Sequence, residues 1–199
     1  PPPPPPPPPP STAPPPPPLY TLYSSSAASD VYKRQRLTFD GIAKGYIVDA
    51  ATRVLEQHRI EDYLVEAGGD IRARGSRGPG SPWTIAVQNP DKTAGFLDTL
   101  ALSRGAVATS GSYEEFYDPE RKHHHIITAD TGVSPQEASS VTVMAPTALA
   151  ADALATSVFL MSPSAGLRFL DSLAGCEGLI VRRDGSLARS TGWRRAVQE

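Results

Sequence analysis

An aspartate inside an apolar segment is the side chain that points most directly to chemistry. Asp152 is the only charged residue between Thr147 and Met161, in a stretch rich in alanine and leucine. A carboxylate in apolar surroundings has to be paired or bound to a cation, because burying it alone is too costly. Thr156 lies one helical turn further along the same face, so two hard oxygens could bind Mg²⁺ there. The alternative is an aspartate on an exposed stripe, with Thr156 in the core.

Three short segments of small residues could bind an anionic ligand through their backbone. They are the run GIAKGY at residues 41–46, with Lys44; the turn of Gly68, Gly69 and Asp70; and the segment Thr109, Ser110 and Gly111. The first segment opens a helix, where free amides and a lysine favour an anion. Glycines after a strand let a ligand approach the backbone closely. Each segment could equally be an ordinary turn or the end of a strand.

Three consecutive histidines, at positions 123–125, precede two isoleucines. On a strand, His123 and His125 share one face and His124 points the other way. We reject a zinc site here, because no cysteine, glutamate or fourth histidine lies at ligand spacing. One histidine acting as a general base or a phosphate partner is the better hypothesis. The alternative is the solvated end of a polar strand.

Hydrophobic periodicity predicts the elements that must position these residues. The pattern favours an α+β fold, with a mixed β-sheet core and packed helices. Helices are predicted over residues 40–58, over residues 147–161 with Thr147 as cap, and from Ser162-Pro163 to near Gly175. The face that we expect the first helix to bury consists of Ile42, Tyr46, Ile47, Ala50, Val54 and Leu55. Strands are predicted over residues 63–67, 71–74, 83–88, 97–103, 106–109, 124–128 and 140–145, with a hairpin over 178–183 and 186–190.

Composition divides the chain near residue 36. Fifteen of the 22 prolines occupy residues 1–10 and 14–18, and such a tract adopts polyproline II or no fixed structure. Residues 1–36 are therefore interpreted as a disordered, non-native leader, and residues 37–199 as the folded domain. An SH3-like ligand or a stiff spacer is the alternative for the leader. It also lacks the basic and apolar regions of a signal peptide.

The charge and hydropathy of the chain exclude two classes of function. The formal net charge is −2, which argues against a basic nucleic-acid interface. No run of 18 apolar residues is present, so no membrane-spanning segment is predicted.

Six segments, taken in order, resemble the FAD:protein FMN transferases of the ApbE family. They are FDGIAKGYIVDAA (39–51), EAGGDI (66–71), WTIAVQNP (83–90), GAVATSGSYEEFY (105–117), HHHIITADTGVSP (123–135) and SSVTVMAPTALAADALATSVFLM (139–161). The resemblance implies a flavin-binding α+β enzyme that uses Mg²⁺ to cleave FAD. The family transfers FMN to a threonine hydroxyl of an acceptor protein and releases AMP. FAD cleavage by water and non-catalytic flavin binding are the alternatives.

The resemblance also implies roles for single residues. Asp152, Thr156 and the carbonyl of Ala43 match the family's metal ligands, and His125 and Asp152 match its catalytic residues. Lys44 joins Ala43 among the positions expected to bind the cofactor. The other expected FAD-binding residues are Gly68, Gly69, Asp70, Thr109, Ser110 and Gly111.

The sequence departs from the family pattern in ways that affect these expectations. Glu66 stands where an asparagine is usual, and this places a negative charge near the nucleotide. The family has a further N-terminal region that supplies part of the flavin pocket, so we expect this chain to be a C-terminal portion with reduced activity. The family also implies a bacterial periplasmic or cell-envelope location.

Overall fold

The computed structural model describes residues 38–92, 95–113, 117–118, 120 and 123–193. The interpretation of residues 1–36 as a leader lies outside this part of the chain and stays a prediction. The described helices are α2 (Ala43–Gln57), α3 (Ala148–Phe159) and α4 (Pro163–Asp171). Across the described residues, no helix is long and apolar enough to cross a membrane.

Eight strands complete the described elements, and every pairing between them is antiparallel. Six form one sheet, in the order β1 (Tyr63–Ala67), β2 (Asp70–Arg74), β5 (Arg104–Gly111), β6 (Ala138–Ala145), β7 (Glu177–Arg182) and β8 (Leu187–Arg189). The other two, β3 (Trp83–Gln88) and β4 (Phe96–Leu102), pair only with each other. The predicted α+β class is confirmed. So are the eight corresponding strands, whose ends lie within two residues of the predicted ones.

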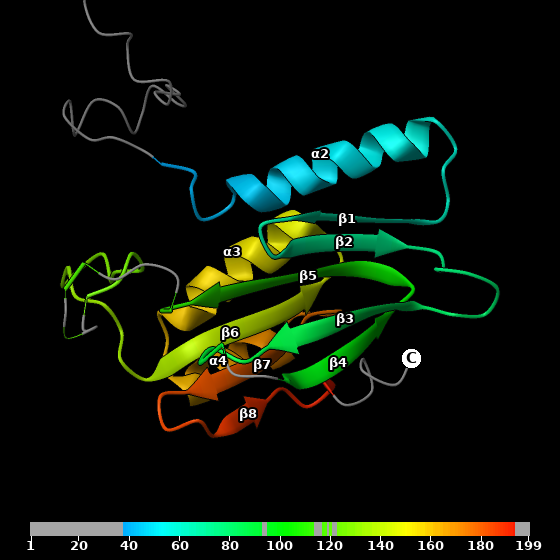
Figure 1. Cartoon of the computed structure of the whole chain (residues 1–199). Helices are drawn as coiled ribbons and strands as arrows, with labels where there is room; N and C mark the ends of the chain where they lie inside the picture. The colour runs from blue at the N-terminus through cyan, green and yellow to red at the C-terminus, as the bar shows by residue number, and fades with distance from the viewer. Residues whose placement is uncertain (1–37, 93–94, 114–116, 119, 121–122, 194–199) are drawn as a thin grey trace, which may run out of the picture. The chain divides into compact units, whose positions relative to one another are not determined.

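The helices and the β3–β4 hairpin cover opposite faces of the six-stranded sheet (Figure 1). Alternation along β5 shows this, since Ala106 and Ala108 pack with α3 whereas Val107 packs with the hairpin. On the helix side, α3 contacts β5 and β6, and α2 contacts α3, β1 and β2. The described part of the chain from Asp40 on therefore has three layers, and α3 is the central helix of the helical layer.

Helix α3 begins where the sequence predicts. Thr147 is extended, and its hydroxyl accepts a hydrogen bond from the Ala150 amide at 3.2 Å. Ala148, Ala151 and Ala155 are fully buried, and their small side chains let the helix lie close to the sheet. Helix α4 has Pro163 in its first turn, as predicted, but it ends at Asp171 and not near Gly175.

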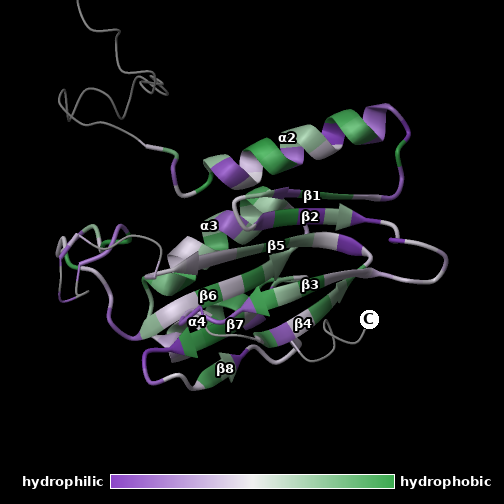
Figure 2. Cartoon of the chain, viewed as in Figure 1, coloured by the Kyte–Doolittle hydropathy of each residue, from purple (hydrophilic) through white to green (hydrophobic). Residues whose placement is uncertain are grey.

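The predicted buried face of α2 is wrong. Tyr46, Ile47 and Val54 are 55%, 60% and 51% exposed, and Figure 2 shows hydrophobic residues along this helix. The buried residues are instead Gly45, Val48, Asp49 and Thr52. The face of α2 that packs on α3 consists of small and hydrogen-bonded residues. The two helices lie close together at Gly45, and the Asp49 carboxylate binds the first turn of α3.

The predicted strand over residues 124–128 is also wrong, because residues 125–128 belong to no strand. The alternation of side chains survives locally, since His123 and His125 are exposed and His124 is fully buried. The His124 ring bonds to the local backbone, accepting from the Ile126 amide at 3.3 Å and lying 3.1 Å from the Pro135 carbonyl. These contacts fix the His124 ring locally, and of residues 124–128 only His124 is a bridge residue.

Candidate functional site

Asp152 lies at the junction of α2 and α3. It is only 4% exposed, and its Oδ2 accepts a hydrogen bond from the Gly45 amide at 3.0 Å. Gly45 belongs to the first turn of α2, where amides are free and the helix dipole favours negative charge. The alternative of an exposed Asp152 is thus excluded, and the carboxylate is held at a helix N-terminus.

A second buried carboxylate, Asp70, lies beside Asp152. Asp70 is 1% exposed, and its Oδ1 pairs with the Lys44 ammonium at 3.1 Å. Its Oδ2 is buried without any hydrogen-bond partner. Burial raises the pKa of Asp70 to about 6, and the negative charge of Asp152 adds to this while Lys44 opposes it. Two buried carboxylates with one lysine leave an excess of negative charge, which a bound cation would neutralise.

Thr156 extends this group along α3. Its hydroxyl lies 3.0 Å from the Ser110 hydroxyl of β5, and its methyl group lies near Gly41, just before α2. Ala43 is the first residue of α2, two positions before the amide that Asp152 binds. The structure therefore brings Ala43, Asp152 and Thr156 to the same end of α2. Hard oxygens of these three kinds fit Mg²⁺.

No three His, Cys, Asp or Glu side chains form a metal-binding cluster among the residues that the structure describes. The predicted donor set contains only one such side chain, since a hydroxyl and a backbone carbonyl complete it. The observation that favours a cation here is the orphaned, buried Oδ2 of Asp70.

The turn between β1 and β2 contributes its backbone. Gly68 and Gly69 have φ values of +60° and +90°, which favour glycine, and the space beside Gly69 is open. Lys44 reaches this turn as well, with its Nζ 3.4 Å from the Gly68 carbonyl. Glu66 accepts a hydrogen bond from the Gly69 amide at 2.7 Å, so its negative charge stabilises the turn itself.

The segment 109–111 divides between the two faces of the sheet. The Ser110 hydroxyl faces α3 and Thr156, whereas the Thr109 hydroxyl lies 2.9 Å from that of Thr142 on the other face. The Tyr113 ring packs directly against Gly111, since its Cε1 would lie 2.3 Å from a Cβ added there. Only Ser110 of this segment thus places its side chain at the Asp152 group.

His125 is exposed, and its neighbour His124 anchors the segment that carries it. The His124 ring packs edge-on against Phe159, the last residue of α3, with centroids 5.5 Å apart. The Ser134 hydroxyl donates to the His124 carbonyl at 2.9 Å, and burial lowers the pKa of His124. His124 is therefore a buried structural side chain, and its neighbour His125 lies on the solvent side of the loop.

The cluster of Asp70, Asp152, Thr156 and Lys44, together with the order of helices and strands in the chain, suggests a comparison with known proteins. A family model described as "ApbE family" matches residues 20–180. The chain belongs to the ApbE family. ApbE relatives similar to it include the FAD:protein FMN transferase of Haemophilus influenzae, 34% identical over 164 residues, covering 80% of this chain and 46% of the relative. The Escherichia coli K12 protein of the same name is 40% identical over 126 residues, covering 61% and 36%.

Solved ApbE structures agree with this assignment. The ApbE protein of Thermotoga maritima superposes with a TM-score of 0.76 at 34% identity, over 82% of this chain and 54% of that one. Flavin transferase ApbE from Vibrio cholerae gives a TM-score of 0.68 at 30% identity, over 78% and 51%. This chain therefore spans between about a third and about half of the length of the ApbE proteins that it matches.

Asp49 is the residue of this region that sequence reasoning did not single out. It lies in the quoted run at 39–51, four residues after Gly45, and both are buried. The spacing of Gly45, Val48, Asp49 and Thr52 was the available signal, because it marks a second helical face made of small and polar residues.

Proposed function

We propose that this chain takes part in Mg²⁺-dependent transfer of FMN from FAD to a threonine hydroxyl of an acceptor protein, with release of AMP. The names of its relatives support a flavin transfer in general. The observation that carries the proposal is the pair of buried carboxylates, Asp70 and Asp152, beside Lys44 at the start of α2. Such an arrangement suits a cation and the phosphates that accompany it.

Asp152, Thr156 and the Ala43 carbonyl are the residues that would hold Mg²⁺. When bound, this ion neutralises charge on the pyrophosphate and on the departing AMP. The chain's own residues then orient the substrate. The N-terminal end of α2, the Lys44 ammonium and the open backbone at Gly69 all favour an anion at this place.

The covalent step exchanges one phosphorus–oxygen bond for another. The acceptor's threonine oxygen bonds to the phosphorus of the FMN half, the bond from that phosphorus to the bridging oxygen breaks, and AMP leaves with the electron pair. The hydroxyl proton passes to a base, and we assign this role to His125. Most of the rate enhancement in such reactions comes from positioning and electrostatics.

Incubation of the 199-residue chain with FAD, Mg²⁺ and a threonine-bearing acceptor protein tests the proposal. We expect a covalent mass increase, equal to FMN less one water, on a small fraction of the acceptor, and we expect it to be lost on chelation of the metal and in Asp152→Asn. Ser157→Ala, on the exposed side of α3, is the matched control and should retain transfer.

Two outcomes would contradict the proposal. Equal labelling by Asp152→Asn and by the unmodified chain would remove Asp152 from the reaction. Release of free FMN and AMP with an unlabelled acceptor would indicate hydrolysis in place of transfer.

A further inference from the structure

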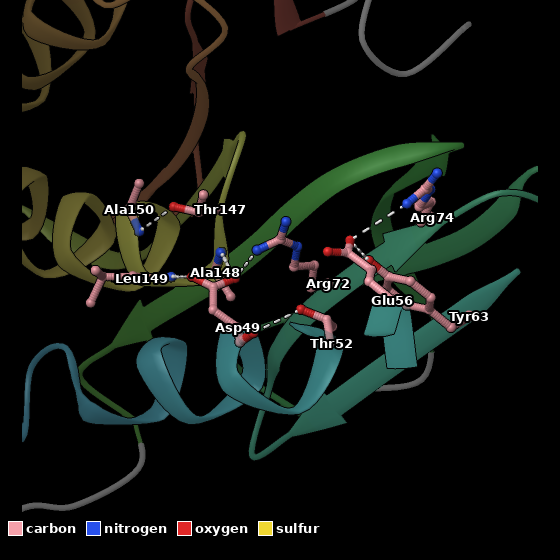
Figure 3. A network of polar contacts seen from close by, with 10 residues as sticks. All are labelled: Asp49, Thr52, Glu56, Tyr63, Arg72, Arg74, Thr147, Ala148, Leu149 and Ala150. Carbon is pink, nitrogen blue, oxygen red and sulfur yellow. Dashed lines mark hydrogen bonds and ion pairs between the residues drawn. The ribbon is translucent and has the colours of Figure 1, made fainter. Parts of the chain in front are cut away.

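Helices α2 and α3 bind each other's first turns through two carboxylates. Asp49 of α2 accepts from the amides of Ala148 and Leu149, at 3.0 Å to Oδ1 and 3.0 Å to Oδ2 (Figure 3). Asp152 of α3 accepts in turn from the Gly45 amide of α2 at 3.0 Å. Each helix thus supplies the anion that the N-terminus of the other helix favours.

The Asp49 carboxylate is fixed from several sides. It is 7% exposed, and the Arg72 guanidinium of β2 pairs with its Oδ1. The Thr52 hydroxyl donates to the Asp49 carbonyl at 3.0 Å. Figure 3 shows the carboxylate between Arg72 and the first residues of α3. Both of its oxygens are engaged, so Asp49 acts on the backbone of α3 and is not itself a metal ligand.

The close approach of the two helices makes the contact sensitive. An ideal Cβ on Gly45 would lie 2.3 Å from the Ala148 carbonyl oxygen, so only glycine fits at this crossing. Asp152 lies one helical turn after Ala148, and its place relative to α2 therefore follows from the amides that Asp49 holds. A small rotation of the first turn of α3 would move the Asp152 oxygens away from α2.

We propose that Asp49 is a positioning residue for the metal site at Asp152 and Thr156, and this inference rests on the proposed function. Asp49 sets the height and rotation of α3 against α2, and so brings the Asp152 and Thr156 oxygens to the Ala43 carbonyl. Outer partners of metal ligands typically change metal affinity about 10–100-fold when they are removed. Asp49 does not bond to a metal ligand directly. It acts through the backbone amides of Ala148 and Leu149, at the start of the helix that carries Asp152.

Direct binding of Mn²⁺, measured by electron paramagnetic resonance on the 199-residue chain, tests the role of Asp49. Asp49→Asn keeps the shape of the side chain but replaces one acceptor oxygen by a donor and removes the negative charge that pairs with Arg72. We expect its Kd for Mn²⁺ to rise about tenfold, with the far-ultraviolet circular dichroism unchanged.

Glu56→Gln is the matched control. Glu56 is also an α2 carboxylate that binds the sheet, through the Tyr63 hydroxyl at 2.6 Å and Arg74 at 3.7 Å, but it does not contact α3 (Figure 3). Its loss should lower stability without changing the Mn²⁺ Kd by more than about twofold. If Asp49→Asn does not fold, Arg72→Gln replaces it, since that variant removes the cation that holds Oδ1 of the Asp49 carboxylate against the first turn of α3 and should still weaken Mn²⁺ binding.

The outcomes separate this inference from the function on which it rests. An unchanged Kd in Asp49→Asn, or in Arg72→Gln where it serves as the replacement, together with lost binding in Asp152→Asn, would overturn the role of Asp49 alone. Equal Mn²⁺ binding by the unmodified chain and Asp152→Asn, or no binding by either, would overturn the metal site and this inference with it.

Discussion

Gly45→Ala is the substitution whose effect the structure predicts most sharply. An ideal Cβ at this position lies 2.3 Å from the Ala148 oxygen, 2.6 Å from the Ala148 carbonyl carbon and 2.8 Å from the Leu149 Cα. All three are backbone atoms, so no side-chain rotation can relieve the overlap. Moving the closest pair from 2.3 Å to an unstrained 3.4 Å requires a separation of about 1.1 Å between α2 and α3.

The net effect of this substitution combines opposing terms. Alanine favours a helix over glycine by about 1 kcal/mol, whereas overpacking typically costs about 1–3 kcal/mol. The separation also lengthens the bonds of Asp49 and Asp152 to the opposite helix, and a hydrogen bond to a charged group contributes about 1.5–3 kcal/mol. We therefore expect the free energy of unfolding to fall by about 2–4 kcal/mol, with weaker Mn²⁺ binding.

Urea unfolding followed by circular dichroism measures this change. Gly41→Ala is the control, because its Cβ would meet only the Thr156 methyl group at 3.9 Å, and its free energy of unfolding should change by less than about 1 kcal/mol. An unchanged or increased stability of Gly45→Ala would refute the close packing of the two helices on which the argument depends.

Three further predictions concern stability. The pKa of Asp70 is raised to about 6 in the fold, so the folded state binds the proton more tightly, and in a metal-free buffer stability should fall as the pH rises from 4 to 6. Asp70→Asn should remove this fall, and an identical pH profile for the variant and the unmodified chain in urea unfolding would contradict it. Thr147→Ala should lower the free energy of unfolding by about 1 kcal/mol, and Ser162→Ala by less, because Ser162 makes no capping bond; equal losses in urea unfolding would argue against the cap. Deleting residues 1–36 should leave the melting temperature unchanged in differential scanning calorimetry, and a clear decrease would show that they belong to the fold.

The sequence predicted those elements whose local pattern agrees with their tertiary surroundings. Helix α3 was found because Thr147 caps an uninterrupted alanine-rich run, and β3 because its alternation matches a half-buried strand. The hairpin of β7 and β8 followed from Asp184 and Gly185 between two apolar runs. In each of these cases the local sequence pattern was enough to predict the element.

The failures have a common physical cause. The apolar stripe of α2 was visible in the sequence, but the helix packs through Gly45 and Asp49, whose suitability depends on amides about a hundred residues away. The residues 124–128 favour a strand by composition, but the His124 ring bonds to the neighbouring backbone. In both cases hydrogen bonds between a side chain and the backbone decide the structure, and periodicity carries no information about them.

The candidate site was predictable in part. The lone charge of Asp152 within an apolar helix left two possibilities open, a buried carboxylate or one on an exposed stripe, and the structure shows that it is buried. The orphaned oxygen of Asp70 could not be foreseen, because it depends on how β2 meets the two helices. Strand alternation alone would have separated the side chains of Thr109 and Ser110.

The reciprocal bonds between α2 and α3 have a consequence for the order of folding. Gly45 and Asp152 are 107 positions apart in the chain, and Asp49 and Ala148 are 99 apart. Contacts of such sequence separation form after local ones, because the loop between them must close first. At about 5–20 residues per second, a ribosome needs on the order of 5–20 s between the two halves of the site. During that interval the nascent chain contains the segment of α2 without that of α3, so none of the reciprocal bonds between the two helices can form.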